Sequence, residues 1–124
     1  MLTTLSMLAG ALFTLQAQLT IIETAEATST PPIVLTVEDK IRAKAVENGF
    51  DPDLLVRIAK AESNLVPTAK NPTSSASGLF QIIKGTWQAF ECEGEVFNED
   101  DNIECAMKIM HSGPHHWNAS KNNW

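Results

Sequence analysis

The sequence contains no tyrosine and only two cysteines among its 124 residues. It is also poor in cations: nine lysines and arginines stand against fifteen acidic residues, which gives a formal net charge of −6. Nonspecific affinity for nucleic acid comes mainly from clustered lysine and arginine, so we expect no nucleic-acid partner. The hydrophobic fraction of 44% is ordinary for a globular protein, and the length fits one domain.

The first 39 residues contain neither lysine nor arginine. Within them, residues 5–15 form an apolar run as long as a signal-peptide core, and residues 25–27 (Ala-Glu-Ala) fit a small-x-small cleavage site. A membrane anchor is the alternative, because residues 2–22 carry no charged side chain and about 20 residues can span a bilayer. Either interpretation predicts a protein exported to the periplasm, the cell envelope or the extracellular space. We expect membrane contact only through such an anchor.

A linker should follow this leader. Residues 28–32 (Thr-Ser-Thr-Pro-Pro) favour a loop, because Pro-Pro cannot continue a helix. The sequence therefore predicts two parts: a leader with its linker over residues 1–32, and one domain over residues 33–124. A domain of that size is small enough to need a covalent cross-link.

Cys92 and Cys105 are the candidates for this cross-link. An even number of cysteines in a small exported domain predicts a disulfide, which would stabilise the fold by about 3 kcal/mol in the chain-entropy model. Zinc is the alternative, because His111, His115 and His116 could add imidazole ligands to the two thiolates. The cysteines lack the close spacing of a structural zinc site, so we favour the disulfide and expect no metal and no cofactor.

The apolar residues follow helical periodicity, and no strand alternation is visible. Thr36 and Asp51 are placed as N-caps of two helices, and Pro52 takes the first position of the second. A short amphipathic piece follows at 86–90, and a last helix should run from about residue 100 to 113. Residues 67–78 are rich in Asn, Pro, Thr, Ser and Gly and therefore predict a loop. The expected fold class is mostly α: a compact helical domain with little or no sheet.

One carboxyl group stands out in the second predicted helix. An apolar stripe of Leu54, Leu55, Ile58 and Ala59 leads, by the same helical steps, to Glu62. A carboxyl group at the end of a core-facing stripe conflicts with simple packing, and such conflicts often mark function. Desolvation there would keep it protonated near neutral pH and able to donate a proton. The alternative is that the helix ends and the side chain points into water.

The residues after this helix add a second signal. Glu62-Ser63 is followed by Pro67, Asn71, Ser75 and then Gly78-Leu79-Phe80-Gln81-Ile82. This order resembles the Glu-Ser … Gly-Leu-Met-Gln pattern of the soluble lytic transglycosylases, which belong to the lysozyme-like superfamily. Asp101-Asn102-Ile103 is similar to the Asn-Ile segment that opens a later helix of the family. The resemblance implies a lysozyme-like helical fold and covers about three quarters of the chain beyond the leader.

The resemblance also implies a reaction. Glu62 would be the single acid/base that cleaves the β-1,4 bond between N-acetylmuramic acid and N-acetylglucosamine in peptidoglycan, leaving a 1,6-anhydro product. No water attacks in this reaction, so no second carboxylate is needed. Independently, residues 63–90 contain no Asp or Glu, whereas a conventional glycosidase has two carboxylates about 5–9.5 Å apart. The next acids, Glu91, Glu93 and Glu95, are more typical of a solvated face.

Two other functions stay open on the sequence. One is a muramidase-type hydrolase of the same fold, which would recruit a distant carboxylate. The other is a catalytically silent glycan-binding module. In each case the expected partner is the glycan strand of peptidoglycan, and the protein is expected to be a monomer.

By resemblance, four residues near the predicted acid/base contact substrate. Ser63 would hydrogen-bond near the reacting sugar, and Gln81 can donate to and accept from an N-acetyl amide. Gly78 would permit close approach of the backbone, and Phe80, in place of the usual methionine, would form an apolar wall. The plain alternatives are a polar helix end for Ser63 and a polar loop end for Gln81.

The sequence departs from the family near its C-terminus. The family usually has Ala-Tyr-Asn-Ala-Gly there, with the tyrosine hydroxyl beside the catalytic glutamate. The closest match is the segment 116–120 (His-Trp-Asn-Ala-Ser), which aligns Trp117 with the tyrosine and Asn118 with the asparagine. We therefore expect Trp117 to lie against Glu62 and Asn118 to line the groove. The substitution is partial, because an indole N–H donates a hydrogen bond but cannot accept one.

Overall fold

The computed structural model describes residues 29–124. The chain divides into two units, Met1–Ile33 and Val34–Trp124. Both interpretations of the leader, over residues 5–15 and 2–22, lie outside the described residues. None of the helices within residues 29–124 has the length and apolar character needed to cross a membrane.

The two helices expected after Thr36 and Asp51 are present as α2 (Val37–Glu47) and α3 (Pro52–Ser63). The Thr36 hydroxyl accepts from the backbone N–H of Asp39, and the Asp39 carboxylate accepts from the N–H of Thr36, which makes a reciprocal capping box. At α3, the carboxylate of Asp51 accepts from the N–H of Asp53. These caps satisfy backbone donors that the first helical turn leaves without partners, so the sequence sets both helix starts locally.

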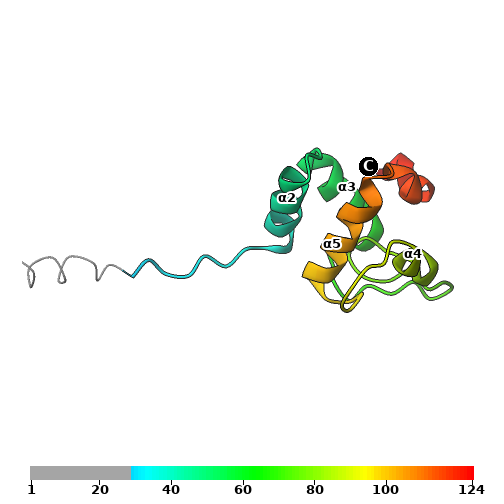
Figure 1. Ribbon diagram of the computed structural model, residues 1–124, viewed down its shortest axis with the longest axis horizontal. Coiled ribbons are helices and arrows are strands. Elements are labelled where there is room, and N and C mark those ends of the chain that lie inside the picture. The colour runs from blue at the N-terminus through cyan, green and yellow to red at the C-terminus, as the bar shows by residue number, and fades with distance from the viewer. Residues whose placement is uncertain (1–28) are drawn as a thin grey trace, which may run out of the picture. The chain divides into compact units, whose positions relative to one another are not determined.

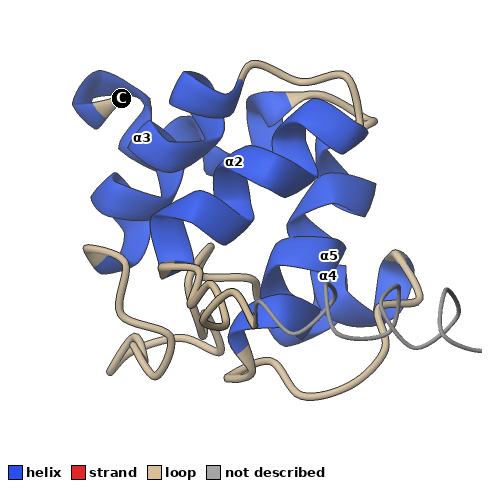
Figure 2. Cartoon of the chain, turned by 90° about the vertical axis from the view of Figure 1, so that its left-hand side faces the viewer, coloured by secondary structure: helices blue, strands red, loops and turns tan. Residues whose placement is uncertain are grey.

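The short and the last predicted helices are also confirmed, as α4 (Lys84–Ala89) and α5 (Glu99–Met110). A further 3-10 helix, η1 (Pro114–Asn123), was not predicted. Its backbone is irregular at Trp117, with φ −106° and ψ 16°, and its sequence shows no clear helical periodicity. No strand occurs within residues 29–124, only isolated bridges near Ser77 in the loop between α3 and α4 (Figure 2). The mostly α fold class is confirmed.

Helix α3 packs against α2 and against η1, and α5 also contacts both of these elements (Figure 1). The buried core comes from these helices and from the loop before α4; its most buried large side chains are Ile41, Leu55, Ile58, Leu79, Phe80, Ile103, Met107 and Ile109. On α3 the expected stripe needs one correction: Val56 is buried, whereas Leu54 is only half-buried. The contact between α3 and η1 brings the C-terminal segment to the predicted acid/base.

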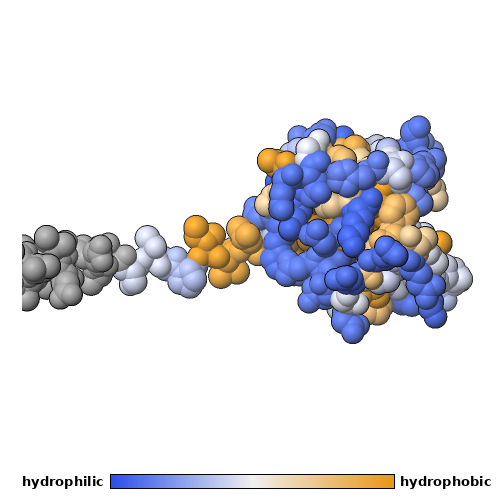
Figure 3. Space-filling view, viewed as in Figure 1, coloured by the Kyte–Doolittle hydropathy of each residue, from blue (hydrophilic) through white to orange (hydrophobic). Residues whose placement is uncertain are grey.

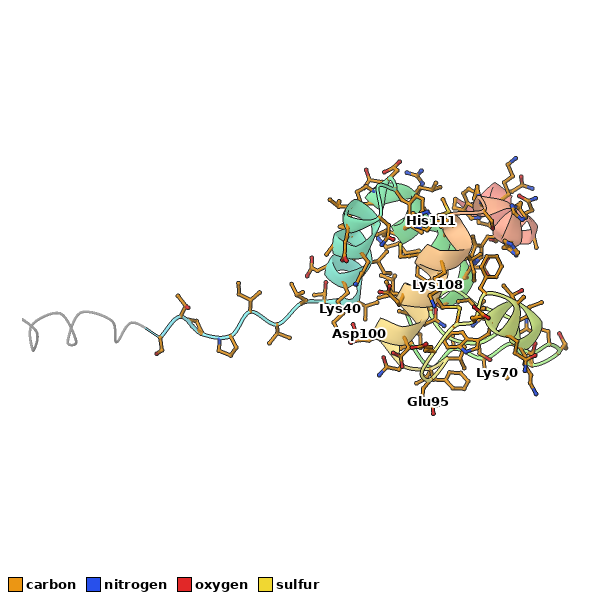
Figure 4. The ribbon with its side chains drawn as sticks, viewed as in Figure 1. Lys40, Lys70, Glu95, Asp100, Lys108 and His111 are labelled. Atoms are coloured by element: carbon orange, nitrogen blue, oxygen red, sulfur yellow. A yellow bond between two sulfur atoms is a disulfide. The ribbon has the colours of Figure 1, made fainter. Side chains whose placement is uncertain are left out.

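Ion pairs join the outer faces of the helices. Lys40 contacts Glu99 at 2.6 Å and Asp100 at 3.1 Å, which links α2 to the start of α5 (Figure 4). Arg42 contacts Asp53 at 2.7 Å and so links α2 to α3. These groups face solvent on a largely hydrophilic surface (Figure 3), so each pair adds little stability by itself.

Cys92 and Cys105 form a disulfide, as the sequence predicted. The bond fixes the loop after α4 to the middle of α5. Because both thiols are used in it, they are not available as the thiolates of the alternative zinc site. Within residues 29–124, no three His, Cys, Asp or Glu side chains lie close enough together to hold a metal ion.

Candidate active site

Glu62 lies in the last turn of α3 and is half-buried. Its Oε1 atom accepts a hydrogen bond from the hydroxyl of Ser120, which belongs to η1 and is 58 residues away in sequence. The carboxyl group is therefore held by a tertiary contact, and the interpretation in which it simply points into water is not supported.

Ser120 is a residue that the sequence analysis missed. Its Oγ atom lies 3.0 Å from the carbonyl oxygen of Trp117, and it accepts a hydrogen bond of 3.0 Å from the indole Nε1 of Trp124. The only signal in the sequence was position: Ser120 ends the segment 116–120 that resembles the family's tyrosine motif. Glu62, Ser120 and Trp124 thus form one hydrogen-bonded cluster.

Trp117 takes part in this site through its backbone. Its indole is 4% exposed and donates from Nε1 to the carbonyl oxygen of Phe80 at 2.9 Å, so this N–H is not directed at Glu62. The ring also lies against Phe80, with 5.9 Å between ring centroids. The link to the carboxyl group is indirect and runs from the carbonyl of Trp117 through Ser120.

A buried asparagine fixes the loop that resembles the family's Gly-Leu-Met-Gln motif. Asn102 of α5 is fully buried; its Oδ1 accepts from the N–H of Phe80 at 2.9 Å, and its Nδ2 donates to the carbonyls of Val96 at 2.8 Å and Ser77 at 3.3 Å. Gly78 has a φ of +79°, and a Cβ atom there would collide with Asn102 and with the Val96 carbonyl. Only glycine fits this position without rearrangement.

The predicted substrate contacts occupy different environments. Gln81 is half-buried and donates from Nε2 to the carbonyls of Ala69 at 3.0 Å and Gly78 at 2.9 Å, which leaves its side-chain oxygen as an acceptor. The Ser63 hydroxyl is buried and donates to the carbonyl of Ala59 at 3.1 Å. Asn118 is exposed on η1.

The Phe80 ring needs a correction. We expected it to form an apolar wall under a sugar, but it has no exposed surface and is part of the core. The reason is that the backbone of Phe80 is fixed on both sides, by Asn102 and by Trp117, which turns the ring inward. At this position the ring is therefore not available to a sugar, and Phe80 contributes only its backbone to the loop.

A cavity of about 120 Å³ lies beside this loop. Its lining includes Gln81, His116, Trp117 and the apolar side chains of Ile82 and Ile109; Glu62 is not part of it. Burial lowers the pKa of His116, and the neighbouring His115 lowers it further.

The site thus has one carboxyl group, that of Glu62, whose position is fixed by a hydrogen bond. The loop that follows Glu62 contains no second acid. Glu62 has one oxygen engaged by Ser120 and a second oxygen for which the described residues give no hydrogen-bond partner. Residues 63–90 contain no other carboxylate. Such an arrangement can donate and take back a proton, which is general acid–base chemistry.

Comparison with protein families supports the resemblance on which these predictions rest. The model described as "Transglycosylase SLT domain" matches residues 39–123, which include Glu62, the 78–82 loop and Ser120. Comparison with curated proteins and with solved structures gave no match. Domains of this family act on peptidoglycan in the cell envelope. Because the family model covers well over half of the chain, the protein belongs to the transglycosylase SLT domain family and has its lysozyme-like helical fold.

Proposed function

We propose that this protein is a peptidoglycan lytic transglycosylase in which Glu62 is the single acid/base. The observation that supports this most strongly is the contact between Glu62 and Ser120, because it holds one carboxyl oxygen inside a family-typical domain. The absence of any Asp or Glu from residues 63–90 supports the transglycosylase over the hydrolase, which needs a second carboxylate to activate water.

In this reaction Glu62 gives up one proton and takes back another. Protonated Glu62 donates to the glycosidic oxygen as the bond between C1 of N-acetylmuramic acid and that oxygen breaks. The C6 hydroxyl oxygen of the same muramic acid then bonds to C1, and its proton passes to the Glu62 carboxylate. The products are a free hydroxyl on N-acetylglucosamine and a 1,6-anhydro ring, with Glu62 protonated again and no water consumed.

The other predicted residues would position the glycan strand. The free side-chain oxygen of Gln81 suits the N–H of an N-acetyl group, and exposed Asn118 can donate or accept at the rim of the groove. Buried Ser63 and the tightly held Gly78 would act by shaping the backbone around the sugar. The substrate lies outside the cytoplasm, so the proposal includes export of the chain.

Mass spectrometry of digested peptidoglycan tests the proposal. Anhydro-muropeptides are expected from the wild-type protein, whereas reducing-end muropeptides would identify a hydrolase, and binding without products would identify a silent module. Glu62→Gln should abolish the products while keeping the fold, because it preserves the shape and removes the transferable proton. Glu91→Gln, an exposed acid just after α4, is the matched control and should keep full activity. Activity of Glu62→Gln within about tenfold of wild type would refute the role of Glu62.

A further inference from the structure

The hydroxyl of Ser120 has more hydrogen-bond contacts than it has hydrogens. Its Oγ lies within hydrogen-bond distance of Glu62 Oε1, the carbonyl oxygen of Trp117 and the indole Nε1 of Trp124. A serine hydroxyl has one hydrogen and two lone pairs. Trp124 can only donate, so it uses a lone pair, and the single hydrogen must go either to Glu62 or to Trp117.

Ser120 can hydrogen-bond to Glu62 both when the carboxyl group is ionised and when it is protonated. When Glu62 is ionised, its carboxylate is the stronger acceptor and takes the Ser120 hydrogen. When the acid proton sits on Oε2, Oε1 is a neutral carbonyl oxygen, which still accepts the Ser120 hydrogen but is a weaker acceptor than the carboxylate. In both states the Trp124 N–H holds the Ser120 oxygen in place, and Oε2 of Glu62 is left to exchange a proton with the glycosidic oxygen.

We propose that Ser120 is a positioning residue for Glu62 and that Trp124 orients Ser120. This inference rests on the proposed function and adds to it: a serine and an indole do together what the resembling family does with one tyrosine hydroxyl. Trp117, which aligns with that tyrosine, cannot take over the role with its side chain, because its indole N–H already donates to the Phe80 carbonyl.

Steady-state kinetics on soluble glycan strands tests the positioning role. Ser120→Ala should lower kcat by roughly tenfold to a hundredfold with little change in KM, since a lost hydrogen bond to a charged group acts on the reacting carboxyl and not on sugar binding. Ser120→Thr keeps the hydroxyl and should restore most of the rate. The kcat of Trp124→Phe should lie between that of Ser120→Ala and that of the wild-type protein. Ser112→Ala is the matched control, because that hydroxyl donates to the Ile109 carbonyl at the end of α5 and should not affect kcat.

A nuclear magnetic resonance measurement separates this inference from the proposed function. The indole N–H signal of Trp124, assigned with Trp124→Phe, should move as Glu62 is titrated with acid in the wild-type protein. The movement should disappear in Glu62→Gln and in Ser120→Ala. If the signal does not follow the titration, or if Ser120→Ala keeps the wild-type kcat, the inference is overturned. An inactive wild-type protein whose Trp124 signal still follows Glu62 would refute the proposed function and support the positioning contact.

Discussion

The indole N–H of Trp117 donates to the carbonyl oxygen of Phe80 at 2.9 Å, across 37 residues of sequence. This bond connects η1 to the 78–82 loop before α4. The backbone carbonyl oxygen of Trp117 lies 3.0 Å from Ser120 Oγ. Through this contact Trp117 is also connected to the Glu62 cluster. Trp117 therefore joins the loop to Glu62, although its side chain makes no hydrogen bond to the carboxyl group.

Replacing Trp117 should affect stability and turnover together. Trp117→Ala should lower the free energy of unfolding by about 3–5 kcal/mol, the usual cost of removing a buried aromatic side chain. Turnover per folded molecule should also fall, because the loop that carries Gln81 loses its hydrogen bond to the Trp117 indole and the segment that carries Ser120 loses its packing against that loop. Trp117→Phe keeps much of the packing and removes the N–H, so it should cost about 1–3 kcal/mol for the Phe80 carbonyl left without a partner. Denaturant unfolding and specific activity on the same samples give both quantities, with exposed Phe97→Ala as the control. A destabilised Trp117→Ala with full specific activity would remove η1 from the active site.

Replacing Asn102 should unfold the loop around Gly78 before other parts of the domain. Asn102→Ala leaves the Phe80 N–H and the Val96 carbonyl without their partner, whereas the Ser77 carbonyl still accepts from the N–H of Ile82 at 3.1 Å; the loss should cost about 2 kcal/mol. Hydrogen exchange of the Phe80 amide should rise by more than that of the α2 amides. Equal changes in both places would contradict a local role for Asn102.

Replacing Gly78 separates a steric clash from a backbone preference. Gly78 and Gly49 have nearly the same φ, +79° and +78°, but a Cβ at Gly49 would meet nothing within 4 Å. Both Gly→Ala variants include the strain of a positive φ, and only Gly78→Ala adds the collision with Asn102 and Val96. The melting temperature of Gly78→Ala should therefore fall clearly below that of Gly49→Ala. Similar melting temperatures would show that the loop can move away from α5.

The disulfide should account for a large share of the stability of this small domain. Its cysteines are 13 residues apart, so removing the bond should cost about 3 kcal/mol and lower the melting temperature by several degrees. The measurement is thermal unfolding with and without reductant, on the wild-type protein and on a Cys92→Ala, Cys105→Ala double variant. Alkylation of the unreduced, denatured protein should label neither thiol. If reductant lowers the melting temperature of the double variant as much as that of the wild-type protein, the loss of stability does not come from this disulfide.

The capping box of α2 predicts a pH-dependent loss of stability. Hydrogen bonds from the Thr36 hydroxyl and backbone lower the pKa of Asp39 below its ordinary value of 3.8, and Arg42 lowers the pKa values of Glu38 and Asp53. A carboxyl group with a lowered folded-state pKa stabilises the fold above its unfolded pKa, and this stabilisation is lost as the pH falls through the folded value. Thr36→Ala should therefore lower the melting temperature at neutral pH, and the difference from wild type should shrink as the pH falls below the ordinary Asp value of 3.8. A difference that stays constant over this range would show that Asp39 is not part of the cap's contribution.

Local features of the sequence were enough to predict the helices and the acid/base candidate. N-caps and a first-turn proline set the starts of α2 and α3 through contacts within a few residues, and the Glu62-Ser63 and 78–82 motifs kept a spacing that could be matched to a family. The even cysteine count in a small domain was enough to predict the disulfide. The helix and disulfide predictions were confirmed because each depends on residues close together in sequence or on a count, whereas the role of Glu62 stays a prediction.

The tertiary structure alone decided which groups meet at Glu62. Ser120 and Trp124 reach the carboxyl group from η1, a 3-10 segment with an irregular backbone and no apolar periodicity that could reveal its path. Phe80 turned inward because two hydrogen bonds fix its backbone: its N–H donates to Asn102, 22 residues away, and its carbonyl accepts from Trp117, 37 residues away. Contacts between such distant residues follow from the packing of α3, α5 and η1 around one core. The sequence pattern does not encode that packing, so it could single out Glu62 as a candidate but not the residues that hold its carboxyl group.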